Sequence, residues 1–195
     1  DPRILPPIEA KIERFTRKSQ TVKNLVLRAQ PDISGLKVTT LGFAYENMQL
    51  VGQGYWRLKD PQGVNPLFKD QHQTQLELVL QSDDFGKGFE HIGLNNVISQ
   101  GQGTAEVELS WPGPAYLPSL AELDGRIKLN VEKGSIIPVE PGAGRIVGLF
   151  ALQALPRRLN LDFTDISSDG LAFKQITGDA LIDKGVVDVS LVQLT

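Results

Sequence analysis

Alternation of apolar and polar residues with a period of two recurs along the chain and constrains its fold more than any other feature. Ile8, Ala10 and Ile12 alternate with charged residues near the start, and residues 127–131 show the same pattern much later. Successive side chains of a β-strand point to opposite faces, so each run forms a strand with one apolar and one polar face. The sequence therefore predicts a mainly β, antiparallel protein.

Short turn signals separate these runs. Residues 32–35, 100–103, 133–134 and 183–185 combine glycine with nearby aspartate, lysine or glutamine, a composition that indicates tight connections. The order predicts a meander in which each strand pairs with the next. Because strands and helices do not alternate, a parallel doubly wound sheet is disfavoured.

Two segments interrupt the alternation and predict short α-helices. Ser82 is expected to cap a helix over residues 83–92, with two acidic residues in its first turn. Residues 143–155 place apolar side chains near a spacing of 3.6, and Pro156 ends that helix. A further short turn is expected over residues 119–123.

The predicted sheet carries more apolar surface than two short helices can cover. A sheet of roughly ten to twelve strands exposes a larger apolar face than a soluble monomer normally tolerates. It must curl, pack on another sheet or hold an apolar ligand. Strand twist and the glycines Gly42, Gly52 and Gly54 favour curling. We expect residues 1–195 to form one elongated, curved antiparallel sheet, a groove or half-pipe that suits acyl chains.

Composition excludes several functions. The chain has 20 basic and 23 acidic residues, a formal net charge of -3 and no basic run, so nucleic acid is not an expected partner. It contains no cysteine, which excludes disulfides and thiolate metal sites. No apolar run reaches the length of about 18 residues that a membrane helix needs. Strand-like sequence at the end predicts a segment of a larger protein, with any membrane anchor outside it.

No catalytic residue, metal or cofactor is expected. His72, in a polar loop, and His91, at the end of the first predicted helix, lack carboxylates at metal-site spacing, and we expect both at the surface. Asp162 and Asp165 lack a neighbouring aromatic platform for a sugar.

Two basic motifs have structural interpretations. The loop 141–145 opens a predicted helix but lacks the Lys-Ser/Thr pair of a phosphate-binding Walker motif, so we interpret it as a tight turn. Arg157 and Arg158 are expected to form ion pairs with Asp162 and Asp165, or with Glu140. An arginine left unpaired at the rim of the groove would instead match the phosphate of a phospholipid.

A series of distinctive motifs follows in order between residues 109 and 184. The motifs are Trp111-Pro112-Gly113, Gly134-Ser135-Ile136, Glu140-Pro141-Gly142 with Gly144-Arg145, Gly148-Leu149, Leu155-Pro156-Arg157-Arg158-Leu159 with Leu161-Asp162-Phe163, and Gly170 with Ala172-Phe173. In this order the segment resembles the C-terminal part of the YhdP branch of the AsmA-like proteins. Those are long envelope proteins of Gram-negative bacteria that are thought to carry phospholipids between the two membranes.

The resemblance implies a non-enzymatic segment of a bridge-like phospholipid transport protein. Lipid tails would slide along a periplasmic β-groove while headgroups stay in water, and an N-terminal helix outside this sequence would anchor the protein in the inner membrane. Contact with the outer membrane is a further implication. The alternative is a periplasmic scaffold whose sheet edge receives a strand during assembly of outer-membrane proteins or the envelope.

The residues expected to line the groove are the apolar members of alternating runs. They are Leu76, Leu78, Leu80, Ala105, Val107, Leu109, Ile127, Leu129, Val131, Leu159, Leu161 and Phe163. We expect the helix over residues 143–155 to cap the last part of this groove or to meet a membrane or partner.

Overall fold

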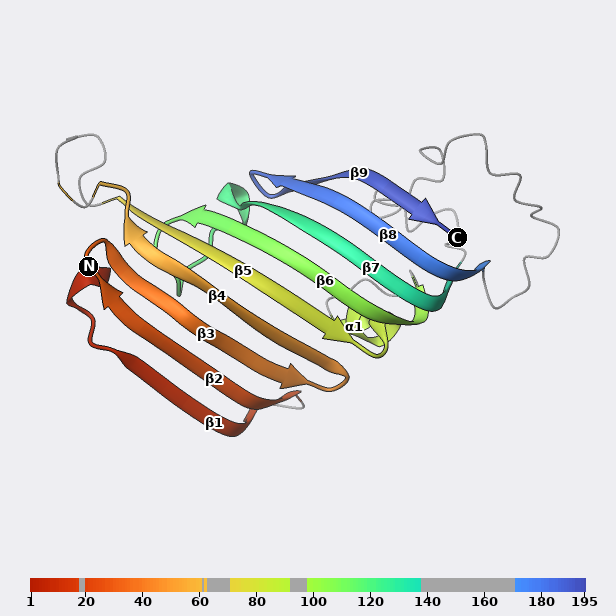
Figure 1. Ribbon diagram of the computed structural model, residues 1–195, viewed down its shortest axis with the longest axis horizontal. Helices are drawn as coiled ribbons and strands as arrows, with labels where there is room; N and C mark the ends of the chain where they lie inside the picture. Colours follow the sequence, from red (N-terminus) through yellow and green to blue (C-terminus); the bar gives the residue numbers. More distant parts are fainter. Residues whose placement is uncertain (18–19, 61, 63–70, 92–97, 138–170) are drawn as a thin grey trace.

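One antiparallel sheet makes up most of the computed structural model, which describes residues 1–17, 20–60, 62, 71–91, 98–137 and 171–195. Its strands are β1 (Ile8–Arg17), β2 (Gln20–Asp32), β3 (Gly35–Tyr45), β4 (Met48–Leu58), β5 (His72–Ser82), β6 (Ile98–Pro112), β7 (Asp124–Ile136), β8 (Leu171–Asp183) and β9 (Val186–Leu194). The nine strands follow one another in sequence order (Figure 1). The predicted mainly β meander is confirmed.

The sheet is open and does not close on itself. β1 and β9 lie at its opposite edges, and the strands twist gradually from one edge to the other (Figure 1). The helical elements in the described residues are short: η1 (Pro2–Ile4), α1 (Phe85–His91) and η3 (Leu120–Glu122). The last of these confirms the expected turn near residue 120. The predicted helix over residues 143–155 and the strand after it lie outside the described residues.

Strand register places the alternating apolar residues on a single face, which we call the apolar face. Three rows that run from β4 to β8 are Leu50–Leu80–Ala105–Leu129–Gly178, Gly52–Leu78–Val107–Ile127–Ala180 and Gly54–Leu76–Leu109–Gly125–Ile182. The residues between them point to the opposite, polar face. There Glu106 is paired with Lys128 and Glu108 with Arg126. Opposite charges placed across strands favour this register over a slipped one.

Two of the predicted turns are wrong, because the chain bends there without leaving the sheet. Gln100 and Lys133 have positive φ angles of 62° and 57°, yet they lie inside β6 and β7. Gln100 is paired with Gly134 across the two strands. The register of β6 against β7 is the same on both sides of these residues, so they distort the two strands locally without an inserted residue. Ile98, beyond this distortion, lies in the hydrophobic core.

The first predicted helix forms, but its expected cap is wrong. β5 continues through Ser82, and α1 begins only at Phe85. The Lys87 amide donates to Asp84 Oδ1 at 3.1 Å, so Asp84 caps the helix. Ser82 Oγ instead accepts from the Asp84 amide at 3.1 Å. The acidic pair therefore precedes the helix and shapes the turn that leads into it.

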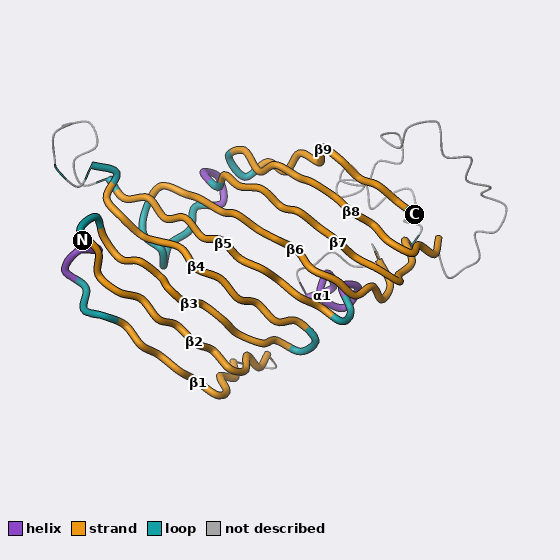
Figure 2. The backbone as a smooth tube through the Cα atoms, in the orientation of Figure 1, coloured by secondary structure: helices purple, strands orange, loops and turns teal. Residues whose placement is uncertain are grey.

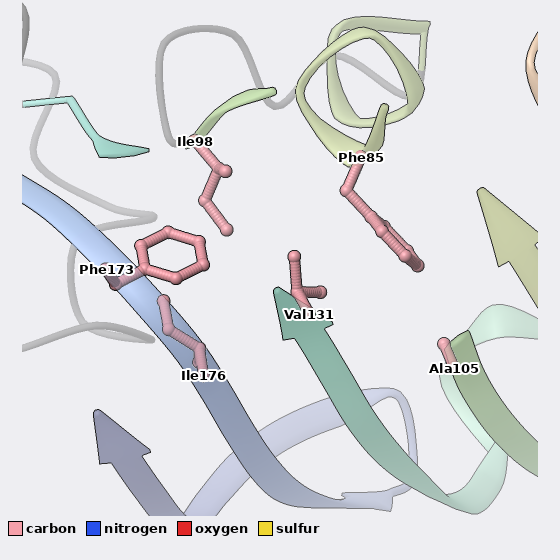
Figure 3. Packing of buried hydrophobic residues seen from close by; sticks show 6 residues of the cluster. All are labelled: Phe85, Ile98, Ala105, Val131, Phe173 and Ile176. Carbon is pink, nitrogen blue, oxygen red and sulfur yellow. The ribbon is translucent and has the colours of Figure 1, made fainter. Parts of the chain in front are cut away.

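Small clusters of buried residues lie toward the ends of the strands. The largest contains Phe85, Ile98, Ala105, Val131, Phe173 and Ile176 (Figure 3). A second contains Ala29, Leu36 and Val38, with Leu5 from the segment that follows η1 packed against it. Each cluster combines the sheet with a short segment that folds over it. Among the described residues, the buried core is thus divided between patches and does not form one central layer.

We predict that Gly54→Ala lowers the free energy of unfolding by about 1–3 kcal/mol. A Cβ at this position would overlap the Gln75 carbonyl oxygen and lie 2.8 Å from Leu76 Cδ2. Chemical denaturation followed by tryptophan fluorescence measures the change, since both tryptophans, Trp56 and Trp111, are buried.

Gly42→Ala is the matched control for this prediction. The nearest atom to its new Cβ is the Leu50 carbonyl oxygen at 3.5 Å, an ordinary contact. Equal losses of stability in both variants would contradict the account of close strand packing at Gly54.

Candidate functional site

The apolar face is a continuous aliphatic surface with no charged residue in its central rows. Leu76, Leu78 and Leu80 of β5 continue into Val107 and Leu109 of β6 at matching register positions. All of these side chains are partly exposed. Covering a partly exposed apolar surface with an apolar ligand is favourable, because it removes that surface from water. Exposed apolar patches of this kind mark binding sites.

The structure brings the described members of the predicted groove lining together on this face. Leu76, Leu78, Leu80, Val107, Leu109, Ile127 and Leu129 lie in its partly exposed centre. Ala105 and Val131 share the face but are buried in the cluster with Phe85. Leu159, Leu161 and Phe163 lie outside the described residues. Contact of any of these side chains with lipid stays a prediction.

Leucine side chains lie over glycines and make the centre of the face smooth. Leu78 Cδ2 lies 2.5 Å from the place that a Cβ of Gly52 would occupy, and Leu109 Cδ2 lies 3.1 Å from that of Gly125. The missing side chains thus provide the space into which neighbouring leucines lean. A long hydrocarbon chain can rest on such a surface without meeting a polar group.

The face extends farther than the sequence pattern indicated. Leu41 and Phe43 of β3 pair with Gly52 and Leu50, and Val189 of β9 pairs with Ala180. In β3 a register shift between Val38 and Leu41 breaks the alternation, which hid this strand from a simple period-two reading. In β8 the sequence did contain the alternation, since Ile176 and Ile182 are an even number of residues apart and small residues lie between them.

At one end of the strands, α1 covers the apolar face. Phe85 is 1% exposed and points from the helix toward the sheet, where it packs with Val131 and Ala105 (Figure 3). α1 contacts β6 directly. The helix therefore borders the partly exposed centre on this side.

At the opposite end, an aromatic group and the β6–β7 loop cover the face. Trp56 Nε1 donates to His72 Nδ1 at 3.0 Å, and the Trp56 ring meets Tyr116 edge-on with centroids 5.6 Å apart. Trp111 Nε1 donates to the Pro114 carbonyl at 3.1 Å and holds the base of the loop. The expectation that His72 lies in a polar surface loop is wrong, because it begins β5 and is partly buried.

A separate hollow of about 300 Å³ lies on the polar face and does not coincide with the apolar surface. Lys37, Arg57, Asp32 and Glu77 are among its lining residues, and the Arg57 guanidinium lies 4.0 Å from the Tyr55 ring centre. Its balanced charges select no ligand class. We therefore regard the apolar face as the candidate site.

The described residues hold no cluster of three or more histidines, cysteines or acidic residues that could bind a metal. None of the helices in that part of the chain has the length and apolarity that crossing a membrane requires.

An open antiparallel sheet with one uncharged aliphatic face is the architecture of this protein, and the comparisons with known proteins identify its family. The chain belongs to the YhdP family, whose model, described as YhdP protein, matches residues 1–195. Over 140 residues it is 30% identical to the intermembrane phospholipid transporter YhdP of Escherichia coli (strain K12). That match covers 71% of this chain but only 11% of the relative. No solved structure matches the chain.

We predict that Phe85→Ala lowers the free energy of unfolding by about 3–5 kcal/mol, since it removes the side chain that fastens α1 to the sheet. The variant should also bind more of an apolar dye, because the covered end of the apolar face becomes accessible. Phe15→Ala is the control: Phe15 is 52% exposed, so its loss should change stability little. A small effect at Phe85 would refute the fastening role.

Proposed function

We propose that this chain is a non-enzymatic segment of a phospholipid transport protein, and that its apolar face carries lipid acyl chains. The observation that supports this most directly is the unbroken register of aliphatic residues from β4 to β8, with Leu78 and its neighbours partly exposed. The E. coli relative, which is named as an intermembrane phospholipid transporter, supports the choice of ligand.

Hydrocarbon transfer energies explain why such a surface helps transport. Moving an acyl chain through water costs about 0.8 kcal/mol per exposed CH₂ group, so two long tails meet a barrier of tens of kcal/mol. A continuous aliphatic surface keeps the tails out of water throughout. This lowers the barrier with no catalytic residue, and it imposes little selectivity on the tails.

The covers at the two ends of the strands define a path. α1 with Phe85 borders one side of the centre, and the β6–β7 loop with Tyr116 borders the other. A tail lying between them would run across successive strands, from one sheet edge toward the other. We infer that the sheet forms a groove in this sense, with the headgroup held at its open side in water.

The name of the E. coli relative, an intermembrane transporter, supports an envelope setting. We propose a periplasmic location for this segment, with the inner-membrane anchor in another part of the protein and outer-membrane contact at its far end. The expected covering role of residues 143–155 belongs to this proposal, and so does phosphate binding by Arg157 or Arg158 in the case that one of them is left unpaired.

Leu78→Asp should remove lipid that co-purifies with the chain, because a carboxylate in the centre of the apolar face must be desolvated when a tail lies over it. Lipid extraction and mass spectrometry of the purified chain measure the phospholipid per protein, and we expect a loss of at least fivefold.

Val79→Asp is the matched control, since Val79 adjoins Leu78 in β5 but lies on the polar face and is 41% exposed. It should retain lipid at the unaltered level. Lipid absent from the unaltered chain, or lost equally from both variants, would refute binding on the apolar face.

Strand addition is the second candidate function, because β1 and β9 each pair with only one neighbour among the described strands. An unpaired edge offers amides and carbonyls to an incoming strand. Ala10→Pro and Lys11→Pro should be tested separately, since only one of two consecutive amides points away from β2.

Under strand addition, the proline that removes the outward amide would abolish capture of an extended peptide, and Leu78→Asp would not. The lipid-carrying proposal expects the reverse for co-purified phospholipid. Pull-down of the peptide and lipid extraction from the same samples separate the two functions.

A further inference from the structure

The most exposed apolar side chains of the described residues all lie at one end of the strands. Their exposed fractions range from 66% to 91%. They are Ile4, Ile33, Tyr116, Leu117, Leu120 and Val186, and we call them the apolar rim. They come from η1, from the β2–β3 and β6–β7 connections and from the first residue of β9, which share one end of an antiparallel meander (Figure 2).

Hydrogen bonds donated by backbone amides hold these connections in place. The Ser34 amide donates to Asp32 Oδ1 at 3.1 Å beside Ile33. Gly113 N donates to the His72 carbonyl at 2.9 Å, and Gly185 N donates to the Leu123 carbonyl at 2.8 Å. The β6–β7 loop is thereby tied to β5 on one side and to the β8–β9 turn on the other. The fold thus presents these apolar side chains on anchored loops.

The arrangement of the rim favours a planar partner. The β2–β3 and β8–β9 turns are six strand positions apart, which corresponds to roughly 29 Å along the sheet edge. Energetically dominant residues of protein interfaces cluster at a compact centre, whereas these residues form a row. Tyr116 adds an aromatic ring with a polar tip, which suits the boundary between headgroups and acyl chains.

The charges at this end of the sheet have both signs. Arg3 and Lys184 are accompanied by Asp1 and Glu122 on the connections and by Asp32 and Asp183 at the strand ends. A mixed surface gains no net attraction to an anionic membrane. Apolar insertion would therefore drive the contact, and neutral lipids would suffice.

We propose that the apolar rim docks on a lipid bilayer, with its side chains in the boundary between headgroups and acyl chains. The proposal rests on the proposed function, because docking would bring lipid to the apolar face. Tyr116 contacts Trp56, so the rim adjoins that face. A lipid tail that leaves the bilayer at the rim would pass Tyr116 and reach the aliphatic rows. The rim would then be a lateral entrance.

The absence of cysteine from the chain makes site-specific labelling a direct test. The 195-residue chain carries a polarity-sensitive fluorophore at Leu117→Cys, at Val51→Cys on the polar face, or at Leu129→Cys on the apolar face. Phosphatidylcholine vesicles are then added. We expect the label at position 117 to shift to shorter wavelength and to brighten at least threefold, and the label at position 51 to stay unchanged. A silent label at 117, or an equal response at 51, would overturn the proposal.

Paired serine variants measure the contribution of the rim to binding. Leu117→Ser with Leu120→Ser should reduce partitioning onto phosphatidylcholine vesicles at least tenfold. Val51→Ser with Val79→Ser removes two exposed apolar side chains from the polar face, and it should leave partitioning unchanged. Equal partitioning of both double variants, or binding that requires anionic lipid and disappears in salt, would overturn docking through apolar insertion.

The two proposals fail in different ways. If lipid is absent from the purified chain, or is lost equally from Leu78→Asp and Val79→Asp, while the label at 117 still responds to vesicles, lipid carriage on the apolar face is refuted and the docking proposal holds. If vesicles change the label at 129 but not the label at 117, the apolar face itself binds the membrane, and the rim proposal is wrong. Unfolding midpoints of all variants exclude loss of fold as the cause.

Discussion

The antiparallel register is the constraint on which the rest of this structure depends. Backbone hydrogen bonds hold each strand against the next so that Leu78, Val107 and Ile127 stand side by side, and a slip of one residue would exchange every apolar side chain for a polar one. Charged partners on the polar face, such as Glu106 and Lys128, favour the same alignment. The apolar face exists only because these alignments agree from strand to strand.

A single layer of strands leaves that face without a second sheet in the described part of the chain. Buried clusters form only where short segments fold over it: α1 with Phe85 at one end, and the β6–β7 loop and the η1 segment at the other. Between them the leucines lean over glycines and form a smooth, partly exposed surface. The same geometry that leaves the described residues without a compact central core provides a surface on which an extended hydrocarbon can lie, so the fold and the proposed function have a common origin.

Much of the fold could be predicted from local pattern, and the errors have local causes. Alternation alone assigned the β-strands and the face to which Leu76, Leu109 and Leu129 belong. The glycine-containing pairs at Gln100 and Lys133 were interpreted as turns because a local distortion within a strand and a turn can use the same left-handed backbone, and only pairing with the partner strand distinguishes them. Strand β3 was missed as part of the face, since its register shift breaks the period on which the prediction relied.

By itself, the sequence determined the strand periodicity, the chemistry of each face and the connections between neighbouring strands, because a period of two is a property of consecutive residues. Tertiary structure alone decided which residues meet across the sheet. Examples are the hydrogen bond from Trp56 to His72, the packing of Phe85 against Val131, and the position of Ile33, Tyr116 and Val186 at one end of the strands. These groupings join residues that are far apart in the chain, and their positions depend on how many strands, bulges and turns lie between them. The pattern of neighbouring residues does not contain this long-range information.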